Sequence, residues 1–163
     1  MTGHFRAGIG YDVHPLVAER RLVLGGVVIA HPKGLQGHSD GDVLTHAVAD
    51  ALIGAAGRGD IGRWFPDTDE QFRGAESLGL LSTVVAALDN SGWKVGNVDA
   101  SIVAQQPRLA PYLDAMGENL ARVLAVPRDA VNVKATSPEY LGSLGREDGI
   151  AAFATALIER QGE

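Results

Sequence analysis

Three potential metal ligands, Asp12, His14 and His46, stand in the first third of the chain. Residues i and i+2 of an extended strand point to the same face, so Asp12 and His14 can present an oxygen and a nitrogen to one point. His46 lies about one turn into a segment with helical periodicity and can reach the same point. Three oxygen and nitrogen ligands with an open fourth position are typical of a catalytic zinc site.

Two simpler interpretations of these residues remain open. An Asp-x-His pair is often the polar end of a surface strand. His46 could lie on a solvated helix face, because Asp42, His46 and Asp50 recur at every fourth position. The combination of the three residues with the segments that follow favours the metal site.

Later segments carry groups that suit a phosphorylated ligand. Residues 59–62 and 65–69 place three aspartates beside glycines, which suits hydroxyl recognition, a divalent cation or a plain surface loop. Residues 136–139 offer two hydroxyls and a carboxylate suited to magnesium, or form a turn set by Pro138. Residues 105–108 end another strand and could be a simple turn with a surface arginine. No complete phosphate-binding or dinucleotide motif occurs, so metal, amides and hydroxyls would hold a phosphate.

Composition excludes several classes of protein. The 163 residues include 20 acidic and 14 basic side chains, and no basic stripe for nucleic acid is visible. The absence of cysteine excludes disulfides and thiolate sites and is compatible with a reducing compartment. No secretory signal and no apolar run of about 18 residues is visible. We therefore expect a cytoplasmic protein without nucleic-acid or membrane partners.

Helical and strand patterns alternate along the chain. We expect strands at residues 5–13, 98–104, 131–135 and 150–158, and a hairpin at 22–29 around Gly25 and Gly26. We expect helices at residues 42–56, 75–90 and 111–125, with a loop at 57–66. Asp40 or Asp42 would cap the first helix. The sequence predicts a single α/β domain of the α+β type over residues 1–163, with a mixed sheet packed against about three helices.

Six segments carry a resemblance to a known family. In chain order they read GYDVH (10–14), HSDGD (38–42), GDIG (59–62), FPDTD (65–69), GNVD (96–99) and VNVKAT (131–136). Together they resemble the 2C-methyl-D-erythritol 2,4-cyclodiphosphate synthases of the non-mevalonate isoprenoid pathway. The resemblance extends over nearly the whole chain.

The resemblance implies a metal-dependent phosphorus–oxygen lyase that works as a homotrimer with active sites between neighbouring subunits. The implied reaction converts 4-diphosphocytidyl-2C-methyl-D-erythritol 2-phosphate into 2C-methyl-D-erythritol 2,4-cyclodiphosphate and releases CMP. One zinc or manganese per subunit would bind Asp12, His14 and His46. Magnesium or manganese would accompany the substrate diphosphate on Glu139. The implied catalytic residues are His38 and Ser137.

The resemblance also implies the substrate contacts. His38 and Ser39 would lie beside the methylerythritol phosphate. The substrate would also contact Asp12, His14, Asp60, Ile61, Gly62, Phe65, Pro66, Asp67, Thr68 and Asp69. The cytidine diphosphate would contact Ala104, Gln105, Gln106, Pro107, Arg108, Leu109 and Ala110. The phosphates would contact Thr136, Ser137, Pro138 and Glu139, with Ser143 and Arg146 at further positions. The chain departs from the family pattern at Arg108, where lysine is common, at Pro138, a threonine-type position, and at Ser143, an aromatic one.

The implied chemistry needs no strong general base, because the nucleophile is the substrate's own anionic 2-phosphate. Positioning can contribute up to roughly 7–11 kcal/mol to such a reaction, and metal ions neutralise the developing charge. The main alternative is a zinc-dependent phosphate hydrolase with His38 or Glu139 as acid or base. A second alternative is a non-catalytic oligomeric binding module with a structural metal.

Overall fold

The computed structural model describes residues 5–160. Within this range, five strands form a mixed sheet in the order β4–β1–β7–β5–β6. Their bounds are β1 Phe5–Ala18, β4 Lys33–Leu35, β5 Trp93–Val103, β6 Val131–Thr136 and β7 Gly149–Arg160. Only the β5–β6 pair is parallel among these strands. The strands β2 (Leu22–Leu24) and β3 (Val27–Ile29) form a separate hairpin.

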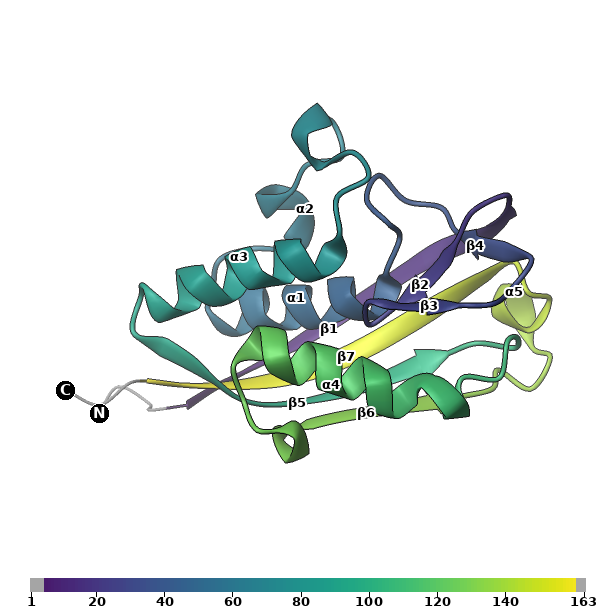
Figure 1. The fold of residues 1–163 in the computed structure, drawn as a ribbon. Coiled ribbons are helices and arrows are strands. Elements are labelled where there is room, and N and C mark those ends of the chain that lie inside the picture. The colour runs from purple at the N-terminus through teal and green to yellow at the C-terminus, as the bar shows by residue number, and fades with distance from the viewer. Residues whose placement is uncertain (1–4, 161–163) are drawn as a thin grey trace.

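Three long helices cover one face of the sheet (Figure 1). They are α1 (Val43–Ala55), α3 (Ser77–Asp89) and α4 (Leu113–Leu124). The short helices are α2 (Ile61–Trp64) and α5 (Gly142–Gly145), with 3-10 turns η1 (Glu70–Phe72), η2 (Ala110–Tyr112) and η3 (Arg128–Ala130). The predicted fold class, a mixed sheet against about three helices, is confirmed. In the part of the chain that the structure describes, no helix has the length and apolar character needed to cross a membrane.

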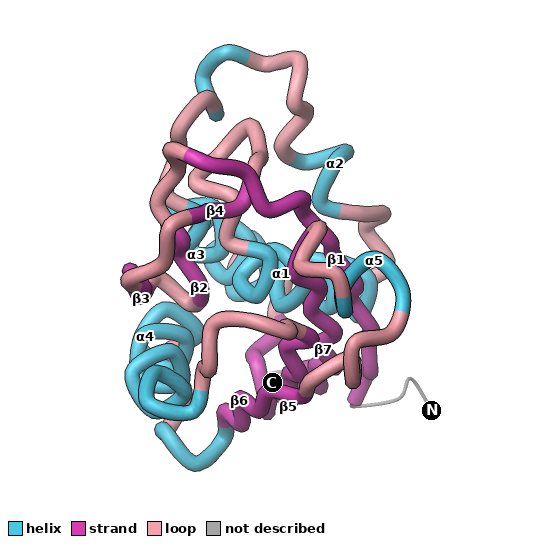
Figure 2. Tube along the Cα trace, turned by 90° about the vertical axis from the view of Figure 1, so that its right-hand side faces the viewer, coloured by secondary structure: helices cyan, strands magenta, loops and turns pink. Residues whose placement is uncertain are grey.

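The two faces of the sheet have different environments. Side chains alternate along β5, where Ala100 and Ile102 are buried against the helices and Asp99 and Ser101 point the other way. Figure 2 shows α1, α3 and α4 on the same side of the sheet. The opposite face carries large apolar side chains that are exposed, and these are Phe5, Ile9, Tyr11, Val13 and Phe153.

Two glycines let α1 pack directly on β1. A Cβ atom on Gly10 would lie 1.9 Å from the carbonyl oxygen of Ala47, and one on Gly8 would lie 2.0 Å from that of Ala51. Both distances are far shorter than any non-bonded contact, so no side chain fits at either position. The helix that carries His46 therefore lies against the strand that carries Asp12.

Several predicted boundaries at the sheet were wrong. The strand predicted at 5–13 continues to Ala18, because its last residues pair with β4, which the sequence pattern did not reveal. The strand predicted at 98–104 begins earlier, at Trp93. A register shift between Val95 and Asn97 interrupts its alternation and hid this first part.

One expectation about the helices was wrong, and the structure decides between the two predicted caps of α1. Residues 61–64, expected in a loop, form α2, because the Asp60 side chain accepts the N–H of Arg63 and caps a helical turn. Of the two cap residues predicted for α1, Asp42 is confirmed, because its side chain accepts the N–H of Thr45. Asp42 is also fully buried, so it does not belong to a solvated stripe with His46 and Asp50.

Candidate active site

Asp12, His14 and His46 converge on one point, as the sequence predicted. Asp12 Oδ2 lies 2.9 Å from both His14 Nε2 and His46 Nδ1, and these two nitrogens are 3.3 Å apart. Among residues 5–160, they form the one group of three or more His, Cys, Asp or Glu residues whose ligand atoms lie close enough to hold a metal ion. Two imidazole nitrogens and a carboxylate oxygen fit a divalent cation such as zinc. We call these three residues the triad.

Hydrogen bonds orient the ring of His14 toward the triad. Its Nδ1 lies 2.7 Å from the carbonyl oxygen of Gln36. A carbonyl oxygen only accepts, so the Nδ1 proton points to Gln36 and the Nε2 lone pair is available to a metal. The backbone after β4 thus selects the histidine tautomer that the site needs.

The charge on the triad follows from its internal contacts. Burial opposes ionisation of Asp12, but hydrogen bonds from His14 and His46 outweigh it and hold the pKa of Asp12 well below its usual range. Burial also lowers the pKa of His14, but the hydrogen bond and the charge of Asp12, together with the hydrogen bond to Gln36, outweigh it and raise that pKa above its usual value. A cation that binds here therefore competes with a proton for the imidazole of His14.

The triad opens into a cavity of about 560 Å³. Its lining, besides the triad, consists of Gly37, His38, Ser39, Ile61, Gly62, Phe65, Pro66, Asp67, Phe72 and Leu80. Of the residues predicted on this side of the substrate, Asp60, Thr68 and Asp69 lie outside the lining. The backbone oxygen of Asp69 instead lies 3.0 Å from His38 Nε2, which fixes the imidazole of His38.

A second cavity, of about 440 Å³, lies where β5 and the parallel β6 end. It is lined by Ala104, Gln105, Gln106, Pro107, Arg108, Leu109, Ala110, Leu113, Ala135, Thr136 and Ser137. The predicted cytidine diphosphate segment and two of the predicted phosphate ligands are therefore together. Pro138 and Glu139 follow in the adjoining turn, outside the lining. The Gln105 side chain accepts the N–H of Tyr140 at 2.9 Å and joins the two segments.

The structure does not bring the two cavities together within one chain. Asp12 pairs with Ala152 of β7, Ala152 with Ile102 of β5, and Ile102 with Ala135 of β6. Three strand spacings of about 4.8 Å place β1 roughly 14 Å from β6. Glu139 is correspondingly not a member of the triad group.

Two further predicted residues lie outside both cavities. Ser143 is part of α5, and Arg146 follows it. The Arg146 guanidinium lies 3.2 Å from the carboxylate of Asp148. Neither residue lines either cavity, so a substrate contact from them within one chain has no support.

Known proteins share the sequence and the fold of this chain. The family model described as YgbB family matches residues 5–159. The chain belongs to the YgbB family. A relative from Syntrophomonas wolfei, named 2-C-methyl-D-erythritol 2,4-cyclodiphosphate synthase, is 57% identical over 155 residues, or 95% of this chain and 99% of the relative.

Solved structures of YgbB-family relatives share the fold. IspF of Plasmodium falciparum, solved as a CDP complex, matches with a TM-score of 0.86 at 30% identity and covers 99% of this chain and 100% of that chain. The bifunctional IspDF from Campylobacter jejuni matches with a TM-score of 0.92 at 41% identity. That match covers 96% of this chain but only 42% of the longer bifunctional chain. The resemblance inferred from the six segments is therefore confirmed.

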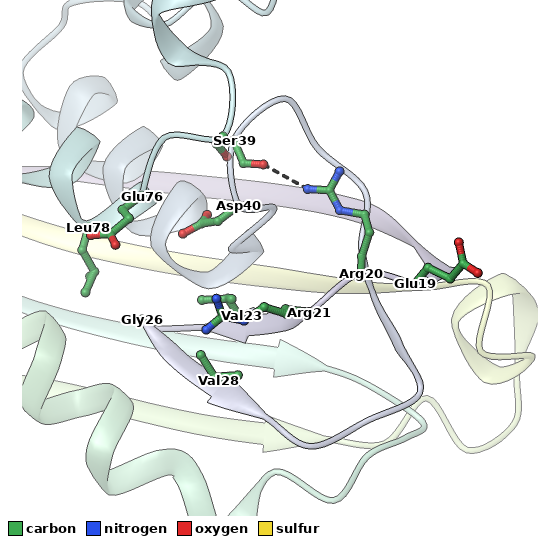
Figure 3. Close-up of a pocket in the computed structure, with 11 residues that line it drawn as sticks. Glu19, Arg20, Arg21, Val23, Gly26, Val28, Ser39, Asp40, Glu76 and Leu78 are labelled. Atoms are coloured by element: carbon green, nitrogen blue, oxygen red, sulfur yellow. Dashed lines mark hydrogen bonds between the residues drawn. The ribbon is translucent and has the colours of Figure 1, made fainter.

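One supporting residue of this YgbB-family site was missed in the sequence. Arg20 donates to the carbonyl oxygens of Gly37 and Ser39 at 3.3 and 3.1 Å. Figure 3 shows the contact with Ser39. These contacts hold the loop that presents His38 to the triad cavity. Arg20 also lines a separate cavity of about 530 Å³ on the other side of this loop. Its partners are 17 and 19 positions away, so no local pattern marks this role.

Proposed function

We propose that this chain catalyses the reaction for which its relatives are named. It would convert 4-diphosphocytidyl-2C-methyl-D-erythritol 2-phosphate into 2C-methyl-D-erythritol 2,4-cyclodiphosphate and CMP, within non-mevalonate isoprenoid biosynthesis. The observation that carries the proposal is the triad, which opens into a cavity lined by His38 and Ser39. The identity of 57% to a named synthase supports the same reaction.

In this reaction an oxygen of the substrate's 2-phosphate attacks one phosphorus of the diphosphate, the one that is attached to the methylerythritol. The bond from that phosphorus to the CMP oxygen breaks, and CMP leaves with the electron pair. The chain must hold two phosphate anions together, so donors preplaced around them have the largest effect. Ser137 is such a donor, because its Oγ accepts the N–H of Glu139 at 2.9 Å and leaves the hydroxyl hydrogen for a phosphate.

We propose zinc or manganese for the triad and magnesium or manganese for the substrate diphosphate. The carboxylate of Glu139 would anchor the second ion, since hard oxygen ligands suit magnesium. When bound, the metals would supply positive charge that offsets the charge on the reacting phosphates. His38, held by the backbone oxygen of Asp69, would orient the methylerythritol phosphate.

We also propose a homotrimer in which the triad cavity of one subunit meets the 104–137 cavity of its neighbour. The two cavities share no lining residue. In the sheet, β7 and β5 lie between β1, which carries Asp12 and His14, and β6, which ends at the second cavity. The exposed apolar side chains on the uncovered sheet face would be buried by such an assembly. We place the protein in the cytoplasm, consistent with a sequence that has no cysteine.

Phosphorus NMR tests this function directly. The protein is incubated with the diphosphocytidyl substrate, zinc and magnesium, and we expect the cyclic diphosphate and CMP in equal amounts. The variant His46→Ala serves as the control and should form neither product. A linear phosphate as the product would instead support the zinc-dependent hydrolase.

A further inference from the structure

The imidazole of His46 has a second set of partners on the side away from the triad. Its Nδ1 faces Asp12, whereas its Nε2 lies 2.8 Å from Ser77 Oγ and 3.0 Å from Ser39 Oγ. Ser77 is the first residue of α3 and is fully buried. His46 therefore joins the triad to the start of a different helix.

The hydrogen bonds along this connection run in one direction. If Nδ1 of His46 binds a metal, it carries no proton, so the proton is on Nε2 and is donated to Ser77 Oγ. The Ser77 hydroxyl in turn donates to Asp40 Oδ1 in a very short contact. The sequence of donors runs from His46 through Ser77 and ends on a carboxylate, which is a strong acceptor.

The carboxylate of Asp40 is itself held in place. It accepts the backbone N–H groups of Ser77 and Asp42, both at 3.1 Å. The backbone N–H of Asp40 donates to the carbonyl oxygen of Ala75, also at 3.1 Å. Backbone contacts from two segments thus fix the end of the His46–Ser77–Asp40 connection.

Ser39 and Ser77 differ in what else they contact. Ser39 lines the triad cavity and belongs to the proposed substrate site, whereas Ser77 does not line it. Ser77 makes the shorter contact with His46 and is linked to a carboxylate. It can therefore act on the metal site without contacting the substrate.

We propose that Ser77 and Asp40 are positioning residues that hold His46 in the tautomer and orientation needed to bind a metal. The inference rests on the proposed function only in taking the triad as a metal site. Groups that bind the far nitrogen of a metal-bound histidine commonly change metal affinity by about 10–100-fold. We expect an effect of that size from the Ser77 hydroxyl.

The experiment measures zinc affinity of the full chain by competition with a fluorescent chelator at neutral pH. We expect Ser77→Ala to weaken zinc binding about 10–100-fold, and Ser77→Thr, which keeps the hydroxyl, to restore most of the affinity. The cobalt-loaded Ser77→Ala protein should also show a changed visible spectrum. Thr83→Ala is the matched control. It removes a hydroxyl from the same helix, and this hydroxyl is exposed and donates to the carbonyl oxygen of Gly79 within that helix.

A second variant keeps the test decisive if Ser77→Ala does not fold. Asp40→Asn preserves the shape of the acceptor but removes its charge, and it should weaken zinc binding while Thr83→Ala does not. The proposal is overturned if a folded Ser77→Ala or Asp40→Asn protein binds zinc within about twofold of the unaltered chain. Failure of the unaltered chain to bind zinc would instead refute the metal site itself, and this inference with it.

Discussion

The carboxylate of Asp42 accepts the backbone N–H of Gly26 at 2.8 Å and so joins the start of α1 to the β2–β3 hairpin. The same side chain accepts from Gly25 N–H at 2.9 Å, Thr45 N–H at 3.0 Å and the Thr45 hydroxyl at 2.7 Å. Because His46 follows in the first turn of α1, these contacts also fix the position of its ring along β1.

Replacing Asp42 by Asn should lower the free energy of unfolding by about 2–4 kcal/mol. The asparagine amide has one acceptor oxygen in place of two. Its NH2 group would face one of the present donors, and that donor would be left without an acceptor in a fully buried site. Urea unfolding measures the change. Asp60→Asn is the control, since asparagine caps a helix about as well as aspartate and Asp60 is exposed. Equal losses in both variants would contradict the role of the hairpin contacts.

Zinc binding should weaken as the pH falls. The neutral form of His14 binds the metal, and the contacts with Asp12 help to raise the pKa of His14 above its usual value. Protons therefore compete with zinc already near neutral pH, and binding releases a proton. Apparent zinc affinities measured between about pH 8 and 5.5 test this competition between protons and zinc. An affinity that does not change across this range would show that His14 is neutral throughout and would refute the prediction.

Glu139→Gln should raise the magnesium concentration needed for half-maximal rate and leave zinc bound. The amide keeps the size of the side chain but removes the charged oxygen that magnesium prefers. Initial rates across a magnesium series, with zinc content measured in parallel, give both quantities. Glu147→Gln, at a half-buried carboxylate in the same region, is the control. A magnesium dependence like that of the unaltered chain would rule out Glu139 as a metal ligand.

Mixed assemblies test whether two subunits share each site. His46→Ala damages the triad side, and Ser137→Ala damages the phosphate side. If neighbouring subunits supply the two sides, co-assembly in equal amounts should restore up to about a quarter of the sites. The rate should then exceed the average of the two separate variants. No gain on co-assembly would place both sides of each site in one chain.

Local sequence pattern was sufficient for parts of the site that depend on one element each. The strand alternation of Asp12 and His14 and the helical position of His46 led to the triad correctly. The hydroxyls of residues 136–137 were placed at a strand end from the pattern, and segment 104–110 was named from the family resemblance. The parallel pairing of β5 and β6 brings the ends of these strands together. These features depend on spacing along the chain, which the sequence contains.

Features that depend on strand order or on distant partners were not predictable in the same way. The separation of Glu139 from the triad follows from β7 and β5 lying between β1 and β6. The contact between His46 and Ser77 joins positions 31 residues apart. The short β4 was missed because its three residues acquire strand structure only by pairing with the end of β1.

The absence of side chains at Gly8 and Gly10 has a consequence for how ligands could be exchanged at the triad. With main chain resting on main chain, the spacing between the backbones of Asp12 and His46 does not depend on the rotamers of any intervening residue. Replacing one ligand by another of different length would then change the metal that fits without altering the scaffold. Conversely, a single methyl group at position 10 would push α1 outward and open the triad, although it touches none of the three ligands.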